Sequence, residues 1–267
     1  MKTLSINSNN PIGFFDSGLG GLTIMQEVNS LLPYEQLIYL ADSKNAPYGK
    51  KSKQQIIDLS IKNTEKLLAF GCKTIVVACN TATTNAIKVL REKYDVPFIG
   101  IEPAIKPAAL KSNTNCVGVL ATKGTLSSEL FALTSKKFEN TTFVEVEGEG
   151  LVEIVENGNL EAATPLLEKY LHQMLAKNVD SIVLGCTHYP MLIPIIKKIL
   201  PPHIALIDSG VAVAKQTKNV LEINDLLNKN HQANENLIYT NGNNKGVLNA
   251  VVNHLQITQA KVFSLDF

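Results

Sequence analysis

The 267-residue chain has no tryptophan, only four cysteines and almost no net charge, with 25 basic against 24 acidic side chains. Such a balance lacks the electropositive surface of a dedicated nucleic-acid-binding protein, so we expect no nucleic-acid partner. Gly, Pro or a charged residue interrupts every apolar stretch before it reaches transmembrane length, so we expect no membrane partner. The segment from Met1 to Asn10 is polar and lacks the apolar core of a secretory signal. These absences predict a cytoplasmic protein.

The cysteines are Cys72, Cys79, Cys116 and Cys186, and none forms a Cys-x-x-Cys pair. Because no export signal is present, a disulfide framework is not expected. Cys72 and Cys116 each open an apolar run, and we interpret them as packing residues. A zinc site made of Cys79, Cys186 and His188 is an alternative, but no fourth ligand is evident. We therefore expect neither a metal nor another cofactor.

Cys79 and Cys186 stand in matching local sequences. Each follows a β-branched apolar run that predicts a buried parallel strand, and each precedes small or hydroxyl-bearing residues and the expected start of a helix. The carboxyl ends of such strands line the crevice where open α/β sheets bind ligands. Two thiols presented in this way indicate a pair that acts on opposite sides of one small-molecule substrate.

A second correspondence supports an internal repeat. The segment 11–18 resembles the segment 116–123 about 105 residues later, and Cys186 follows Cys79 by 107 residues. Two pairs with nearly the same offset indicate a duplicated α/β unit. The alternative is that apolar parallel strands simply resemble one another.

Predicted strands alternate with predicted helices along the chain. They lie at 12–15, 37–41, 74–78, 97–101, 116–121, 142–146, 181–185, 204–207 and 237–240. This alternation predicts an α/β fold of two similar doubly wound parallel-sheet domains, related by pseudo-twofold symmetry, with the active site in the crevice between them. The segment 101–104 resembles a crossover from the first half of the chain to the second, and the segment 207–210 resembles the return to the first. We therefore assign residues 1–100 plus 208–267 to the first domain and 101–207 to the second.

Further polar residues follow predicted strands. Asp16 ends the first strand before a glycine-rich turn that fits neither the dinucleotide-binding nor the Walker pattern. Because a carboxylate at this position would repel a phosphate, Asp16 is better suited to bind a substrate ammonium group or to orient a nearby acid or base. A helix N-cap is the alternative role for Asp16. The loop 42–49 can offer backbone amides to a carboxylate. His188 stands two residues after Cys186, where it can assist proton transfer or simply be a core histidine.

Together these segments resemble the glutamate racemases, cofactor-independent enzymes of the aspartate/glutamate/hydantoin racemase superfamily. The matching segments occur in the family's order and span most of the chain. They are FDSGLGG at 15–21, PYG at 47–49, ACNTA at 78–82 and LGCTHYP at 184–190, with weaker matches at 119–125 and 207–210.

The resemblance implies interconversion of L- and D-glutamate by two-base proton transfer at the α-carbon, which would supply D-glutamate for bacterial peptidoglycan. It implies catalytic roles for Cys79, Cys186, Asp16, Glu156 and His188, with Asp16 and Glu156 near Cys79 and His188 near Cys186. The substrate-binding residues that it implies are Asp16, Ser17, Tyr48, Gly49, Asn80, Thr81, Thr122, Thr187 and His188.

The chain departs from the family's pattern in two places. Asn45 stands where the family often has Arg, and the segment 147–158 lacks the family's usual Cys-Pro. The family's acidic helper maps onto Glu156, with Glu153 as the alternative. An aspartate-specific sister racemase and a non-enzymatic ligand-binding protein are alternative functions, and a homodimer is retained as a hypothesis.

Overall fold

The computed structural model describes residues 7–230, 232 and 234–267. The first six residues of the polar segment 1–10 thus lie outside the described part. The strands are β1 (Ile12–Asp16), β2 (Leu37–Ala41), β3 (Thr74–Val77), β4 (Phe98–Gly100), β5 (Cys116–Ala121), β6 (Thr142–Glu147), β7 (Ser181–Gly185), β8 (Ala205–Ile207), β9 (Asn236–Thr240) and β10 (Ala260–Ser264).

Helices connect these strands. They are α1 (Leu22–Leu31), α2 (Lys53–Ala69), α3 (Asn80–Lys93), α4 (Ile105–Lys111), α5 (Lys123–Leu126), α6 (Glu129–Ser135), α7 (Leu151–Glu156), α8 (Thr164–Leu175), α9 (Ile193–Ile199), α10 (Gly210–Ile223) and α11 (Lys245–His254). Among the described residues, no helix is long and apolar enough to cross a membrane.

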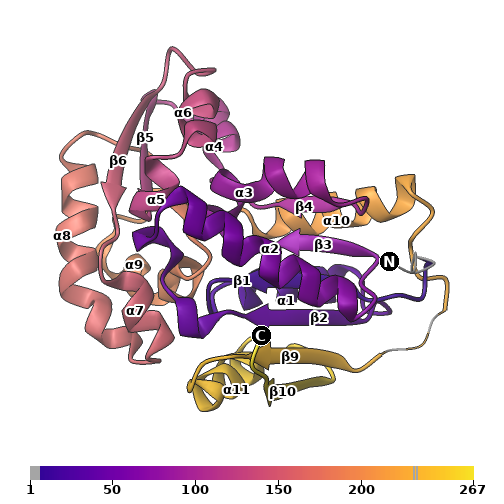
Figure 1. Ribbon diagram of the computed structural model, residues 1–267. Helices are drawn as coiled ribbons and strands as arrows, with labels where there is room; N and C mark the ends of the chain where they lie inside the picture. Colours follow the sequence, from indigo (N-terminus) through magenta and orange to yellow (C-terminus); the bar gives the residue numbers. More distant parts are fainter. Residues whose placement is uncertain (1–6, 231, 233) are drawn as a thin grey trace.

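The strands form two parallel sheets (Figure 1). The first has the order β10-β9-β2-β1-β3-β4 and the second the order β6-β5-β7-β8. The order β2-β1-β3-β4 thus recurs as β6-β5-β7-β8, with the matched segments 11–18 and 116–123 on β1 and β5. The predicted fold class, two parallel-sheet α/β domains, is confirmed.

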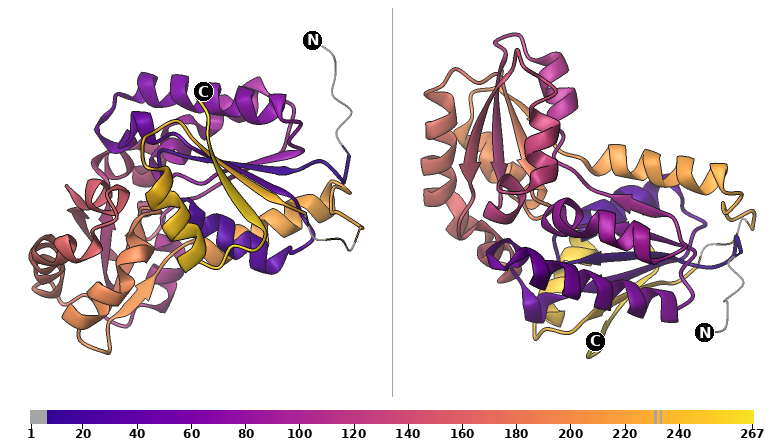
Figure 2. Two further views of the ribbon diagram at one scale, coloured as in Figure 1. Left: turned by 90° about the horizontal axis from the view of Figure 1, so that it is seen from below. Right: turned by 45° about the horizontal axis from the view of Figure 1, so that its top comes forward.

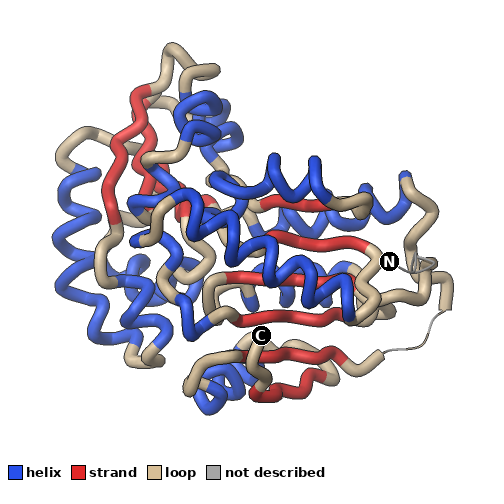
Figure 3. Tube along the Cα trace, viewed as in Figure 1, coloured by secondary structure: helices blue, strands red, loops and turns tan. Residues whose placement is uncertain are grey.

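Side-chain alternation explains why helices cover both faces of the first sheet. On β1, Phe14 packs into the cluster that contains Leu22 and Met25 of α1, whereas Phe15 packs into the cluster that contains Leu67 of α2 and Leu90 of α3. Every residue of β1, β2, β3 and β7 is buried. Such continuous apolar strands are typical of parallel sheets with both faces covered. Figure 3 shows the strands of this sheet side by side between helices.

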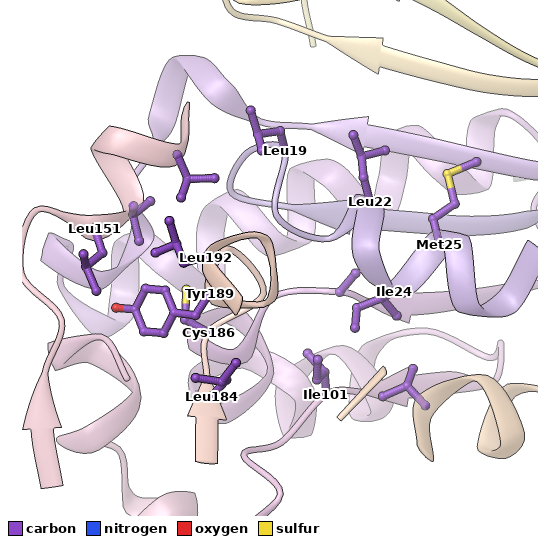
Figure 4. Close-up of a cluster of buried hydrophobic side chains, with 14 of the residues drawn as sticks. Leu19, Leu22, Ile24, Met25, Ile101, Leu151, Leu184, Cys186, Tyr189 and Leu192 are labelled. Atoms are coloured by element: carbon purple, nitrogen blue, oxygen red, sulfur yellow. The ribbon is translucent and has the colours of Figure 1, made fainter. Parts of the chain in front are cut away.

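One apolar cluster continues from the first domain into the second (Figure 4). It joins Leu19 and Leu22 to Leu151, Tyr189 and Leu192, all of which are fully buried. Burying a large apolar side chain stabilises a fold by about 1.5–3 kcal/mol. This cluster therefore holds the two domains together beside the carboxyl ends of their strands.

After β8 the chain returns to the first sheet. Helix α10 packs against α1 and β4, and β9 and β10 extend the sheet beyond β2. Figure 2 shows α10 extending along the first domain. The division into 1–100 plus 208–267 and 101–207 remains our proposal. Strand β10 was not predicted, because its residues Ala-Lys-Val-Phe-Ser are half polar and carry little strand signal.

A buried ion pair lies at the amino end of the first sheet. Lys73 Nζ is 2.6 Å from Glu35 Oε2, and both side chains are almost fully buried. Lys73 also donates to the Ser8 carbonyl, and Glu35 accepts from the Asn228 amide. These bonds join four segments that are distant along the chain, at the end of the sheet opposite to the carboxyl ends of its strands.

Candidate active site

The carboxyl ends of strands from both sheets meet around one small cavity. Its lining residues are Ser17, Pro47, Tyr48, Gly49, Cys79, Asn80, Thr81, Thr122, Val152, Cys186, Thr187 and His188. Both cysteines and every substrate-binding candidate except Asp16 are therefore brought together. The cavity volume of about 10 Å³ is close to the space that one water molecule needs.

Cys79 occupies the point where β3 passes into α3. It is the N-cap residue of α3, and its Sγ accepts a hydrogen bond from the Ala82 amide at 3.4 Å. Helix α3 begins at Asn80, directly after the cysteine as expected. Burial and the neighbouring Asp16 carboxylate nevertheless raise the pKa of the Cys79 thiol well above its usual value. The surroundings of Cys79 therefore favour its neutral thiol form.

Asp16 lies directly behind the cavity and is fully buried. Its Oδ2 accepts from the Gly21 amide at 2.8 Å and from Thr187 Oγ1 of the second domain at 3.4 Å. Gly21, rather than Asp16, is the N-cap residue of α1, so the N-cap alternative is wrong. Burial raises the pKa of Asp16, and His188, the Gly21 amide and Cys79 partly offset that rise.

Cys186 follows β7 on the opposite side of the cavity. Its Sγ lies 3.7 Å from Nδ1 of His188, which is itself fully buried. Burial lowers the pKa of His188, but the contacts with Cys186 and Glu156 raise it more, so the pKa lies well above its usual value. The helix expected directly after Cys186 is instead a short 3-10 turn, Tyr189–Leu192, that leads into α9.

Glu156 contacts His188 and not Cys79 within the described part of the chain. His188 Nε2 lies 2.6 Å from Glu156 Oε1, which also accepts from the Leu19 amide at 2.6 Å. Glu156 thus adjoins the histidine of the other thiol, and its expected role near Cys79 stays a prediction. Glu153, the alternative helper, instead forms an ion pair with Lys50 at the surface.

Tyr48 and Gly49 line the cavity from a loop that is held in place by the buried carboxylate of Asp42. Tyr48 donates to Asp42 at 2.5 Å, and Asn45 donates to the same carboxylate at 2.8 Å. Asn45, the residue that departs from the family's pattern, therefore supports the loop. Thr81 of the first domain and Thr122 of the second lie 2.8 Å apart, which joins the domains on this side of the cavity.

The sequence did not reveal several residues at the site. Val152 lines the cavity, and Ser43 and Asn244 contact Glu156. Val152 looks like any core residue of α7, and Asn244 stands in a polar turn far along the chain, so neither gave a local signal.

Cys79, Cys186 and His188, the ligands of the alternative zinc site, line the same cavity. No group of three or more His, Cys, Asp or Glu side chains among the described residues is arranged to hold a metal ion.

Comparison with known proteins identifies relatives over most of the chain. Residues 19–217 match the model of the Asp/Glu/Hydantoin racemase family. A glutamate racemase of Ectopseudomonas mendocina is 46% identical over 221 residues, which cover 81% of this chain and 84% of that protein.

Solved structures agree with this match. A glutamate racemase isoform of Bacillus anthracis superposes with a TM-score of 0.87 at 28% identity, covering 98% of this chain and 99% of that one. The glutamate racemase of Francisella tularensis, solved in complex with D-glutamate, gives a TM-score of 0.82 at 32% identity, covering 97% and 99%.

The paired parallel-sheet domains and these relatives define the class of protein, which is an amino-acid racemase. Within that class, the chain belongs to the Asp/Glu/hydantoin racemase family.

Two glycines of the loop after β1 allow the closed arrangement. A Cβ on Gly18 would lie 1.8 Å from Glu156 Oε1, and one on Gly20 would lie 2.4 Å from His188 Nδ1. We expect Gly20→Ala to displace the histidine and to lower racemase activity by roughly 100-fold, as misplacement of a reacting group by about 1 Å does. Activity should be measured beside thermal unfolding.

Gly246 is the matched control, because a Cβ there meets nothing within 4 Å. Gly246→Ala lies in α11 and should leave activity unchanged while stabilising the helix slightly. Equal activity of the Gly20→Ala and Gly246→Ala variants would refute the steric argument.

Proposed function

We propose that the protein interconverts L- and D-glutamate by proton transfer between the α-carbon and the thiols Cys79 and Cys186. The observation that carries this proposal is that the two cysteines, from equivalent strands of the two domains, line one cavity. The relatives named glutamate racemases support the choice of substrate.

The chemistry requires a base and an acid on opposite faces of the α-carbon. One thiolate removes the α-proton, and the thiol on the other face returns a proton, so that the roles exchange with the direction of reaction. A single base would have to cross the substrate between the two events. By family resemblance, Cys79 acts on D-glutamate and Cys186 on L-glutamate.

The two thiols have different neighbours, a carboxylate beside Cys79 and a histidine beside Cys186. Asp16 adjoins Cys79 and can accept its proton, and one of its oxygens, Oδ1, is buried without a hydrogen-bond partner in the described structure. A substrate ammonium group would satisfy such an oxygen and would favour the thiolate by its charge. His188, held by Glu156, adjoins Cys186 and can exchange a proton with it.

The remaining candidates supply hydrogen bonds to the substrate. Ser17, Asn80, Thr81, Thr122 and Thr187 present hydroxyl or amide groups, and Tyr48 and Gly49 lie on the opposing loop. Donors aimed at the substrate carboxylate stabilise the negative charge that develops when the α-proton leaves. Because the closed cavity is too small for glutamate, we infer that the domains separate to admit it.

The first test is racemisation itself. The optical signal of L- or D-glutamate, followed by circular dichroism, should decay to zero at the same rate with and without a chelator, because the proposed acids and bases are all side chains. Aspartate serves as the comparison substrate. Loss of activity on chelation, restored by zinc, would contradict the cofactor-free mechanism, and faster turnover of aspartate would favour the aspartate-specific sister activity.

The second test separates the two faces. A serine hydroxyl can donate a proton but is a poor base, so Cys79→Ser should impair proton removal from the D-configured substrate more, and Cys186→Ser from the L-configured one. Elimination from 3-chloroglutamate enantiomers isolates this step. Cys→Ala at either position should abolish racemisation. Identical directional defects in the two serine variants would show that the faces are assigned wrongly.

We propose that the D-glutamate formed supplies bacterial peptidoglycan. A strain depleted of the protein should stop building cell wall and should recover when D-glutamate is supplied and taken up. Failure to recover despite measured uptake would argue against this role. The homodimer remains a hypothesis that sedimentation at several protein concentrations decides.

A further inference from the structure

A side chain from the C-terminal part of the first domain reaches the candidate active site. Asn244 is the N-cap residue of α11, which follows β9, the strand between β10 and β2 (Figure 1). Its Nδ2 donates to Glu156 Oε2 and to Ser43 Oγ, both at 2.9 Å. Its Oδ1 accepts from Thr240 Oγ1 at 3.0 Å, and Thr240 is fully buried. The amide is therefore fixed on both sides.

Both carboxylate oxygens of Glu156 therefore form hydrogen bonds. Oε2 accepts from Asn244, while Oε1 accepts from the Leu19 amide and contacts His188. A carboxylate held at one oxygen cannot rotate freely about its bond to the side chain. The contact between the other oxygen and His188 then keeps one geometry.

We propose that Asn244 is a positioning residue, which orients Glu156 against His188 and thereby sets how readily the His188–Cys186 pair exchanges a proton. This inference rests on the proposed function, in which His188 assists Cys186. A charge-assisted hydrogen bond to a carboxylate is about twice as strong as a neutral one, so its loss should release Glu156 measurably.

Other titratable groups also face this pair. They are Asp16 on β1, Tyr39 on β2, Cys186 after β7 and Glu153 on α7, which is itself paired with Lys50. Substituting Asn244 by alanine changes the charge of none of them. A change in the titration of His188 would therefore report the release of Glu156.

The test compares Asn244→Ala with Asn243→Ala, an exposed neighbour in the same turn. Nitrogen NMR of the full chain, with His188 assigned among the five histidines, gives its titration directly. Because the Glu156 contact raises the pKa of His188, its loosening in Asn244→Ala should lower that pKa toward the usual value. Asn243→Ala should titrate like the unaltered protein.

The activity arm uses elimination from 3-chloroglutamate enantiomers. Asn244→Ala should slow proton removal from the L-configured substrate at least about tenfold, a part of the 10²–10⁴ that a positioned acid or base contributes. Removal from the D-configured substrate should change much less. Asn244→Gln, which keeps an amide donor, should recover part of the loss. In a Glu156→Gln background, Asn244→Ala should add little, because the two residues act through one contact.

An unchanged His188 titration in a folded Asn244→Ala variant would overturn the inference, and so would equal losses from both enantiomers or full additivity with Glu156→Gln. If the unaltered protein does not act on glutamate, the proposed function fails, while the NMR comparison still decides whether Asn244 positions Glu156.

Discussion

The hydrogen bonds of the Glu156 carboxylate hold the elements around the site together. The carboxylate projects from α7 of the second domain, accepts hydrogen bonds from Leu19 and Asn244 of the first, and reaches His188 on the loop after β7. One side chain thus links the two domains and fixes the imidazole beside Cys186. Such a contact is available only because Gly18 and Gly20 carry no side chain, so that the loop after β1 can approach both the carboxylate and the histidine.

The amino end of the first sheet stabilises the fold, whereas its carboxyl end contributes to the candidate site. At the amino end, the buried pair of Lys73 and Glu35 closes the fold, where removal of either partner would leave a buried charge unpaired. At the carboxyl end, polar side chains from both sheets surround a cavity. This division follows from the parallel arrangement, because all strands of a parallel sheet end on the same side and their last residues border one crevice.

The two thiols have different surroundings. Around Cys79, desolvation and the Asp16 carboxylate favour the neutral thiol, whereas Cys186 adjoins a histidine whose pKa is raised. The site is therefore asymmetric although the strands that carry the thiols are equivalent. Asp16 and Glu156 do not line the cavity, and they adjoin Cys79 and His188 respectively.

The sequence by itself determined the parallel-sheet domains, their repeat and the two thiols, because apolar strand runs and the residues that directly follow them are local patterns. It also identified the loop residues Tyr48 and Gly49, which the structure places in the cavity. Only the tertiary structure decided that Glu156 contacts His188, that Glu153 pairs with Lys50 at the surface, and that Asn244 contacts Glu156. Those contacts join residues that are distant along the chain, and their geometry follows from how the two domains pack, which no local pattern encodes. The half-polar strand β10 was missed for the same reason, since pairing with β9 and not its own composition makes it a strand.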